Sequence, residues 1–275
     1  MSAENSSIAI SVAECIARDF AALPQVEAVV MAGSRASEFA DAESDVDLYV
    51  YVTEDIRLDE RARIAAGSSR VEIGNATWEP GDEWIDSRTV TRVDVMFRHV
   101  RWIEEQLDRV LVRHQASPGY STCFWYNILH SVALFDRNGW FATLEKRATV
   151  SYPPELRKAI IAKNYPLLRR NQSSYLHQIE LAVKRNDPIS VNHRVAALLA
   201  SYFDVLFAVN ELPHPGEKRI LDHAKASCSR LPGGLERQVR ELAKNPADDV
   251  LRRINAIVDG LDALLVREGL MPGGR

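Results

Sequence analysis

The chain has little cysteine, and its cysteines are not arranged for metal binding. Three of them, Cys15, Cys123 and Cys228, are spread over 275 residues, and the seven histidines are equally scattered. There is no CxxC pair and no Cys/His group with zinc spacing, which argues against a zinc enzyme. An odd number of distant cysteines also gives no disulfide framework. The sequence therefore predicts three reduced thiols in a cytoplasmic protein.

Long apolar runs and a positive net charge are also missing. No stretch approaches the roughly 20 apolar residues that a membrane-spanning helix requires. The N-terminal segment MSAENSSIAISVAECIARDF lacks the basic region and small-residue cleavage site of a secretory signal. A formal net charge of -4 gives no indication of a general nucleic-acid-binding surface. We expect neither a membrane partner nor general nucleic-acid binding, although a local basic patch is compatible with this charge.

The pattern of the first half predicts a mixture of helices and strands. Helical spacing of Ile8, Val12, Ile16 and Phe20 indicates a helix over 7–22. Apolar, β-branched runs predict strands, and alternation predicts that Asp94 faces away from its apolar neighbours. Residues 74–88 are expected to form a loop rich in Trp and acids. The predicted strands are 26–33, 46–52, 90–97 and, more weakly, 71–79; the predicted short helices are 59–67 and 101–114.

From about residue 150 the strand signals end and helical ones continue. Asp187 followed by Pro188 has the form of a helix cap with Pro at the first helical position, and Asn245 with Pro246 repeats it. The fold class is therefore α+β: a mixed sheet with flanking helices, followed by an all-α helical bundle. We place the first domain at 1–145 and the helical domain at 146–275.

Two aspartates stand at the start of an apolar strand, where carboxylates are costly to bury. Residues i and i+2 of a strand share one face, so Asp45 and Asp47 converge, and each raises the energy of the other's charge. A hard divalent cation held by oxygen ligands offsets this repulsion. If the strand of Asp94 pairs beside the first, Asp94 completes a three-carboxylate cluster. Such a cluster can hold two metal ions for phosphoryl-type transfer.

A Gly-Ser pair precedes these aspartates. Gly33 allows close approach of the backbone to a ligand, while exposed N–H groups and the Ser34 hydroxyl can hold phosphate oxygens. Arg35 is placed to add positive charge. The GxGxxG and GxxxxGK[ST] patterns are both absent, so the segment matches neither a Rossmann site nor a P-loop.

The segment AGSRASEFADAESDVDLYVYV resembles the signature of the nucleotidyltransferase fold, the DNA polymerase beta superfamily. Gly33, Ser34, Asp45 and Asp47 match that signature, Ser44 before Asp45 is a common form of it, and Asp94 matches its third acidic residue. The helical half is similar, more loosely, to aminoglycoside and lincosamide nucleotidyltransferases, and the chain resembles still more an uncharacterised two-domain bacterial branch. In LFAVNELPHPGEKRI, the resemblance implies that Lys218 reaches the phosphates of the nucleotide; the alternative is a solvated lysine at a helix start.

The resemblance implies transfer of a nucleoside monophosphate, AMP from ATP, to an acceptor hydroxyl. Asp45, Asp47 and Asp94 would bind two Mg²⁺ ions, with Mn²⁺ as a substitute, and Asp94 would help to deprotonate the acceptor. Pyrophosphate would leave. The resemblance does not specify the acceptor; a small molecule, aminoglycoside-like, is favoured over a protein.

The acceptor expectation comes from the 74–88 segment. Trp78 and Trp84 with Glu79 and Glu83 could cradle a cationic, sugar-like acceptor, and either glutamate is an alternative base. The alternative interpretation is a solvated hairpin loop with Trp packed beneath it.

Three other functions remain open at the level of sequence. The acceptor could be a protein side chain, as in adenylylating antitoxins. The helical half could be a ribonuclease, because Arg170, Asn171 and His177 in RNQSSYLH resemble the Arg-to-His motif of toxin-type helical RNases. The chain could also be a non-catalytic nucleotide-binding module.

Overall fold

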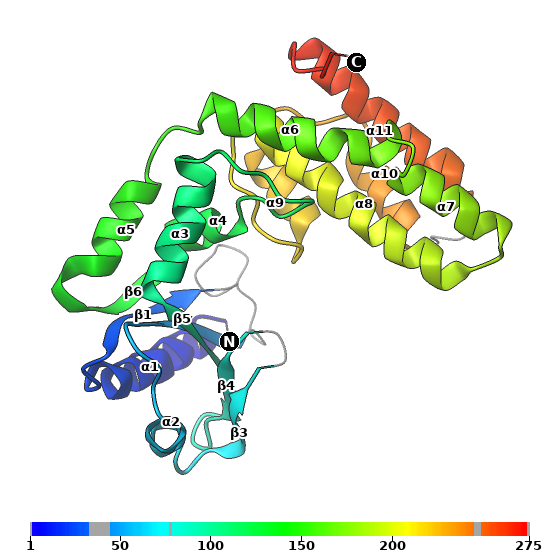
Figure 1. Ribbon diagram of the computed structural model, residues 1–275. Helices are drawn as coiled ribbons and strands as arrows, with labels where there is room; N and C mark the ends of the chain where they lie inside the picture. Colours follow the sequence, from blue (N-terminus) through cyan, green and yellow to red (C-terminus); the bar gives the residue numbers. More distant parts are fainter. Residues whose placement is uncertain (1, 33–44, 77–78, 245–248, 274–275) are drawn as a thin grey trace. The chain divides into compact units, whose positions relative to one another are not determined.

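The computed structural model describes residues 2–32, 45–76, 79–244 and 249–273 (Figure 1). The chain forms two compact units: residues 1–108 with 127–150, and residues 109–126 with 151–275. The second unit thus includes a segment from the first half of the chain. The expected domain boundary between residues 145 and 146 stays a prediction.

A six-stranded mixed sheet, in the order β3-β4-β5-β2-β1-β6, organises the first unit. Strands β2 and β5 run parallel, whereas the other neighbouring pairs are antiparallel. The α+β class predicted from the sequence is confirmed, with helices α5 to α11 following the sheet. The strands are β1 (Val26–Ala32), β2 (Val46–Val52), β3 (Ser69–Asn75), β4 (Gly81–Ile85), β5 (Arg92–His99) and β6 (Val132–Asp136).

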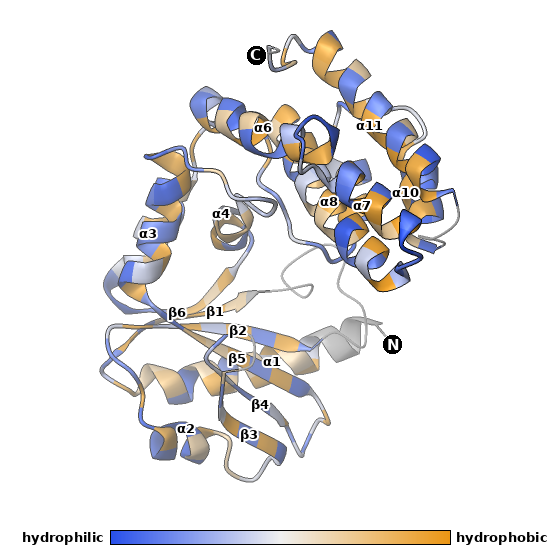
Figure 2. Ribbon diagram, turned by 45° about the vertical axis from the view of Figure 1, so that its right-hand side comes forward, coloured by the Kyte–Doolittle hydropathy of each residue, from blue (hydrophilic) through white to orange (hydrophobic). Residues whose placement is uncertain are grey.

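One face of this sheet packs against helices α1 (Ser2–Ala21) and α2 (Leu58–Ile64) (Figure 1 and Figure 2). Alternate residues of β2 and β5, such as Leu48 and Val95, are buried in the core on this face, as their period-two pattern predicted. Phe20 of α1 joins them, whereas Ile8 is 40% exposed and lies outside the buried stripe that we expected to include it.

The other face is covered in part by α5 (Trp140–Ala148), in the same unit. The Tyr51 ring of β2 lies 5.2 Å from the ring of Trp140 and 5.9 Å from that of Phe141. These centroid separations are typical of aromatic pairs that add to the stability of a core. They cover the far end of β2, away from its aspartates.

A buried ion pair connects α2 to strand β4. Arg61 donates from Nε to Asp82 at 2.8 Å and from Nη2 to the carbonyl of Gly81 at 3.0 Å. Asp82 is fully buried and also accepts a hydrogen bond from the backbone N–H of Gly74 in β3. The Arg61 guanidinium lies 4.1 Å from the centre of the Phe97 ring. One charged pair therefore holds α2, β3, β4 and β5 together.

The second unit is helical, and its core is centred on α8. Asp187 caps this helix, since its side chain accepts from the N–H of Ser190 at 3.0 Å, and Pro188 occupies the first helical position as predicted. Helices α3 (Val100–Leu111) and α4 (Cys123–Leu129) are each divided between the two units. The helices wholly within the second unit are α6 (Pro154–Arg169), α7 (Tyr175–Lys184), α8 (Pro188–Val209), α9 (Ile220–Ser227), α10 (Leu235–Lys244) and α11 (Val250–Arg267).

Three elements of the structure differ from the sequence expectation. Residues 74–88, expected to be a loop, contain strand β4 and the end of β3, whose cross-strand partners stabilise a segment rich in Gly and Asp. Strand β6 and helix α4 were not predicted. Helix α11 begins at Val250, and the predicted cap at Asn245 and Pro246 lies outside the described residues.

All three cysteines lie within the described residues. Cys15, Cys123 and Cys228 are free thiols. Among the helices of the described residues, none is both long enough and apolar enough to cross a membrane.

Asp204 is a buried acid at the centre of a hydrogen-bond network in the second unit. Its carboxylate accepts from the Ser121 N–H at 3.0 Å, from the Ser121 hydroxyl at 2.6 Å and from the side-chain amide of Asn164 at 2.9 Å. Asn164 in turn accepts from the N–H of Gly119 at 2.8 Å. Burial raises the pKa of Asp204 to about 6, although these donors oppose the rise.

We expect Arg61→Ala to lower the free energy of unfolding by about 3–5 kcal/mol, because it leaves the buried Asp82 carboxylate without its partner. Urea unfolding measures this loss. Arg63→Ala, on the same helix but with a side chain 72% exposed, is the matched control and should change stability by less than about 0.5 kcal/mol. Equal effects of the two substitutions would contradict a structural role of the buried pair.

Asp204 should make stability depend on pH. Its pKa is higher in the folded than in the unfolded chain, so its contribution is greatest below about pH 4 and is lost as the pH rises to about 6. Relative to Asp204→Asn, which cannot titrate, the unmodified protein should lose roughly 3 kcal/mol over this window. Unfolding curves measured at several pH values give the difference. A constant difference from pH 4 to 7 would refute the assignment.

Candidate active site

Strands β2 and β5 bring two aspartates together at one end of the sheet. The strands are parallel neighbours, and Asp47 lies directly opposite Asp94 in their register. Neighbouring strands are about 4.8 Å apart, so the two side chains leave the same face at close range. Asp45 immediately precedes β2. The condition set by the sequence, that the strand of Asp94 pairs beside that of Asp47, is thus confirmed.

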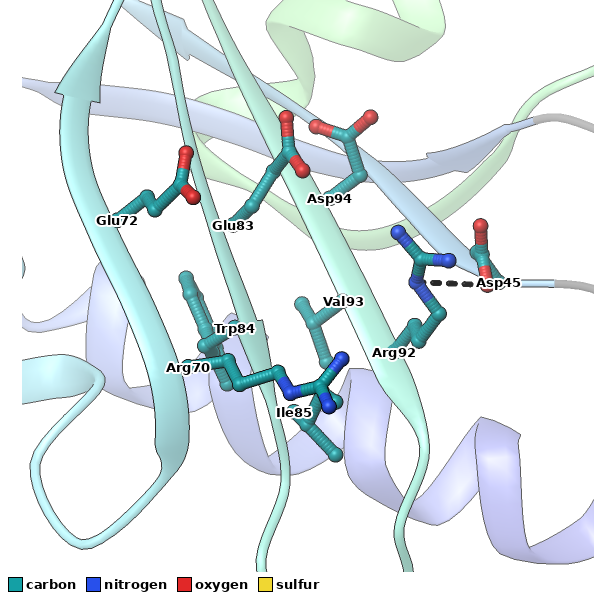
Figure 3. Close-up of a pocket in the computed structure, with 9 residues that line it drawn as sticks. All are labelled: Asp45, Arg70, Glu72, Glu83, Trp84, Ile85, Arg92, Val93 and Asp94. Atoms are coloured by element: carbon teal, nitrogen blue, oxygen red, sulfur yellow. Dashed lines mark ion pairs between the residues drawn. The ribbon is translucent and has the colours of Figure 1, made fainter.

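The register extends this pair into a row of carboxylates across four strands. Glu83 of β4 lies opposite Asp94, and Glu72 of β3 lies opposite Glu83. The row therefore reads Glu72, Glu83, Asp94 and Asp47, from β3 to β2. Figure 3 shows the carboxylates of Glu72, Glu83 and Asp94 pointing in the same direction. We refer to these four residues as the acidic row.

A second row lies one pleat away and contains positive charge. Arg92 is two residues before Asp94, and its guanidinium lies 3.7 Å from the Asp45 carboxylate (Figure 3). Ile85 of β4 lies opposite Arg92, and Arg70 of β3 lies at the same level. The two rows line a cavity of about 270 Å³ formed by Asp45, Arg70, Glu72, Glu83, Trp84, Ile85, Arg92, Val93 and Asp94.

A buried arginine supports the same face of the sheet behind the acidic row. Arg98 of β5 is 4% exposed, and its guanidinium lies 3.7 Å from the centre of the Tyr49 ring. Both carboxylate oxygens of Glu79 accept from Arg98, at 2.9 Å each. Burial raises the pKa of Tyr49, so this phenol stays neutral beside the pair. Glu79 is therefore part of a structural ion pair.

The other expected acceptor residues have different surroundings. Glu83 lies in the acidic row and accepts a hydrogen bond from the Asn75 amide at 3.1 Å. Trp84 is only 4% exposed and is part of the apolar core, because alternation along β4 turns it to the face opposite Glu83. The Trp84 ring thus has little surface to offer as a stacking platform.

Among the residues predicted to bind phosphate, only Lys218 lies within the described residues. Lys218 is exposed and belongs to the second unit, just before α9, and its contact with a nucleotide stays a prediction. The remaining nominated residues lie outside the described ones: Gly33, Ser34, Arg35, Ser44 and Trp78.

Sequence reasoning missed Glu72, Arg70 and Arg92. A weak signal exists for Glu72, which is separated from Glu83 by a segment containing Gly and Pro, as in a hairpin. The pairing of the two glutamates depends on register shifts in β3, however, and these are not readable from the sequence.

The chemistry of the acidic row fits a hard divalent cation. Carboxylate oxygens are the ligands that Mg²⁺ prefers, and a cation would offset the repulsion between Asp47 and Asp94. Within the described ranges, no three acidic, His or Cys side chains converge closely enough to hold an ion as they stand. Asp45 faces Arg92. A site shared by Asp45, Asp47 and Asp94 therefore requires the Asp45 side chain to turn from Arg92 to the other two.

Comparisons with known proteins give a limited result. No protein-family model and no curated protein matches the sequence. Among solved structures, the chain is similar to a nucleotidyltransferase-like protein from Exiguobacterium sibiricum 255-15. The match has 14% sequence identity and a TM-score of 0.40, and covers 92% of this chain and 73% of that one. A likeness of this degree adds no support for an activity.

Glu79 and Glu83 should respond differently to removal of their charge. Glu79→Gln weakens the acceptor of the buried Arg98 and should lower the free energy of unfolding by about 1–3 kcal/mol. Glu83→Gln relieves repulsion from its neighbours Glu72 and Asp94, so stability should stay unchanged or rise. Urea unfolding at neutral pH tests the pair. A larger loss for Glu83→Gln would contradict the roles given to both residues.

Proposed function

We propose that the first unit binds a metal–nucleoside triphosphate complex and transfers the nucleoside monophosphate, AMP from ATP, to an acceptor hydroxyl. The observation that carries this proposal is the direct pairing of Asp47 with Asp94 on parallel neighbouring strands. Two like charges at this spacing repel each other, and a cation bound between them offsets that repulsion. Asp45, next to Asp47, supplies a further carboxylate.

The chain's own residues would perform two tasks in this reaction. Asp45, Asp47 and Asp94 hold two Mg²⁺ ions, which supply neutralisation of the triphosphate and of the developing charge on the leaving pyrophosphate. Asp94, or Glu83 beside it, accepts the proton of the acceptor hydroxyl. The acceptor oxygen then forms a bond to the α-phosphorus as the bond to pyrophosphate breaks.

Residues from the sequence signature complete the proposed nucleotide site. Gly33, Ser34, Arg35 and Ser44 would contact the triphosphate through backbone N–H groups, hydroxyls and one guanidinium. Lys218 would add a positive charge to the leaving group. The first four assignments depend on the motif and its spacing, and that of Lys218 depends on the resemblance of the segment LFAVNELPHPGEKRI.

Binding of Mn²⁺ and ATP tests the site without knowledge of the acceptor. We expect Asp47→Asn and Asp94→Asn each to weaken calorimetric binding of Mn²⁺, in the presence of a non-hydrolysable ATP analogue, by at least about 100-fold. Asp55→Asn, an exposed aspartate in the loop after β2, is the control and should leave binding unchanged. Unchanged binding in both site variants would refute the proposal.

A second measurement separates catalysis from binding alone. With labelled ATP, Mg²⁺ and pooled acceptors, pyrophosphate release should require both Asp47 and Asp94.

Tight metal–nucleotide binding without any transfer to small molecules or proteins would favour a non-catalytic module. Label transferred to a protein would favour an adenylylating regulator. RNA cleavage that is lost in His177→Ala would instead assign a ribonuclease activity to the helical half.

A further inference from the structure

We propose that the cavity beside Asp94 binds an acceptor that carries both a cationic and an anionic group as well as its reactive hydroxyl. The inference rests on the proposed function for its reaction, because it treats Asp94 as the point of transfer. It departs from the purely cationic, aminoglycoside-like acceptor that the sequence suggested. The cavity itself, however, is lined by residues of strands β3, β4 and β5 and by Asp45, just before β2.

The acidic row determines where a cationic group would bind. Glu83 and Glu72 lie on the first and the second strand beyond Asp94. Their Cα atoms are therefore about 5 Å and 10 Å from that of Asp94. If the reactive hydroxyl binds near Asp94, the rest of the acceptor would thus lie over β4. An ammonium group on that body would lie between Glu83 and Glu72. Glu83 keeps acceptor capacity there, since only one of its oxygens receives the Asn75 amide.

The arginines determine where an anionic group would bind. Arg92 and Arg70 approach the cavity from β5 and β3, two residues along their strands from Asp94 and Glu72. Figure 3 shows Arg70 extending from β3 across β4 at the level of Ile85. The i to i+2 spacing separates the two charged rows by about 7 Å at the backbone. A carboxylate or phosphate on the acceptor would meet both guanidinium groups, which suit such bidentate partners.

Arg70 and Arg92 limit how many ammonium groups a ligand can place in this cavity, although four carboxylates also line it. Arg70 and Arg92 would face any second or third ammonium group of such a ligand, and like charges in one site cost free energy. Arg92 also changes partner under this scheme. Its ion pair with Asp45 is long, at 3.7 Å, and 68% of the Arg92 side chain is exposed. When Asp45 turns to a metal ion, Arg92 becomes available to an anion on the acceptor.

The volume of the cavity limits the size of the ligand. About 270 Å³ is slightly below the range of roughly 300–1,000 Å³ that is usual for drug-sized ligands. The part of the acceptor that enters is therefore about as large as one sugar ring with its substituents. Ile85 provides the apolar part of the floor against which such a ring would pack.

Three matched sugars test the charge preference. Glucosamine 6-phosphate carries an amine, a phosphate and hydroxyls, whereas glucosamine lacks the anion and glucose 6-phosphate lacks the cation. Calorimetry in the presence and absence of Mg²⁺ and a non-hydrolysable ATP analogue should show glucosamine 6-phosphate binding at least about tenfold tighter than either partial match. The polycation neamine should bind more weakly than glucosamine 6-phosphate.

Variants that remove charge test separately the preference for an anionic group and the preference for a cationic group. Arg70→Gln with Arg92→Gln should abolish the advantage of glucosamine 6-phosphate over glucosamine. Glu72→Gln with Glu83→Gln should abolish its advantage over glucose 6-phosphate. Arg63→Gln and Glu54→Gln, both exposed and outside the cavity, are the controls and should change neither ratio.

The outcomes separate this inference from the proposed function. Neamine binding tighter than all three sugars, no binding of any sugar, or ratios unaffected by the four cavity substitutions would each overturn the inference. None of these results bears on metal and nucleotide binding, which Asp47→Asn and Asp94→Asn test separately. Conversely, a sugar preference found together with Mn²⁺ binding that neither Asp47→Asn nor Asp94→Asn changes would uphold the cavity and refute the transferase.

Discussion

The parallel pairing of β2 with β5 is the constraint on which the candidate site depends. Parallel register places residues of equal depth side by side, so two aspartates near the starts of their strands become direct neighbours. Nearly fifty residues separate Asp47 from Asp94 along the chain, and an antiparallel pairing would have carried one of them toward the far end of the sheet. The chain makes this parallel connection through α2 and the β3–β4 hairpin. That crossover adds the two strands that continue the acidic row.

The two faces of the sheet handle charge in opposite ways. On the face toward α1 and α2, the single carboxylate of Asp82 is fully buried and has an arginine, two hydrogen bonds to that arginine and a backbone N–H. On the other face, the carboxylates of Asp47, Asp94 and Glu83 stay partly exposed, with like charges as cross-strand neighbours. The first arrangement holds the strands together, whereas in the second a bound cation would offset the repulsion between neighbouring carboxylates. Farther along the second face, the buried Arg98 and its partner Glu79 also contribute to stability, so only the end near the aspartates is given to the proposed chemistry.

Much of the fold was predictable where the pattern was local. The period of two in β2 and β5, the cap at Asp187 and the loss of strand signals after residue 150 each depend on residues close in sequence. Strand β4 was missed because Gly81 and Asp82 disfavour strands, and only their partners Met96 and Val95 on β5 make them strand residues. Similarly, the sequence left open whether Trp84 forms an acceptor platform or packs beneath the segment, and alternation along β4 places it in the core.

The residues of the candidate site also differ in how far local sequence patterns predict them. Asp45, Asp47 and Asp94 follow from motif and strand period, since both are properties of short segments. Glu72 and Arg70 follow from the register of β3, which its β-bulges determine and no local pattern reveals. Arg92 lies two residues before Asp94 on the same strand, and alternation alone places the two on one face. Arg70 itself has a positive φ of 51°, a conformation that non-glycine residues seldom adopt and that accompanies the irregularity in the strand. Glu72 and Arg70, which are proposed to select the acceptor, therefore could not be predicted from local patterns, whereas the three aspartates could be nominated from the sequence although their meeting depends on the pairing of β2 with β5. A chain with the same motif but a different register in β3 would keep the proposed chemistry and change its acceptor.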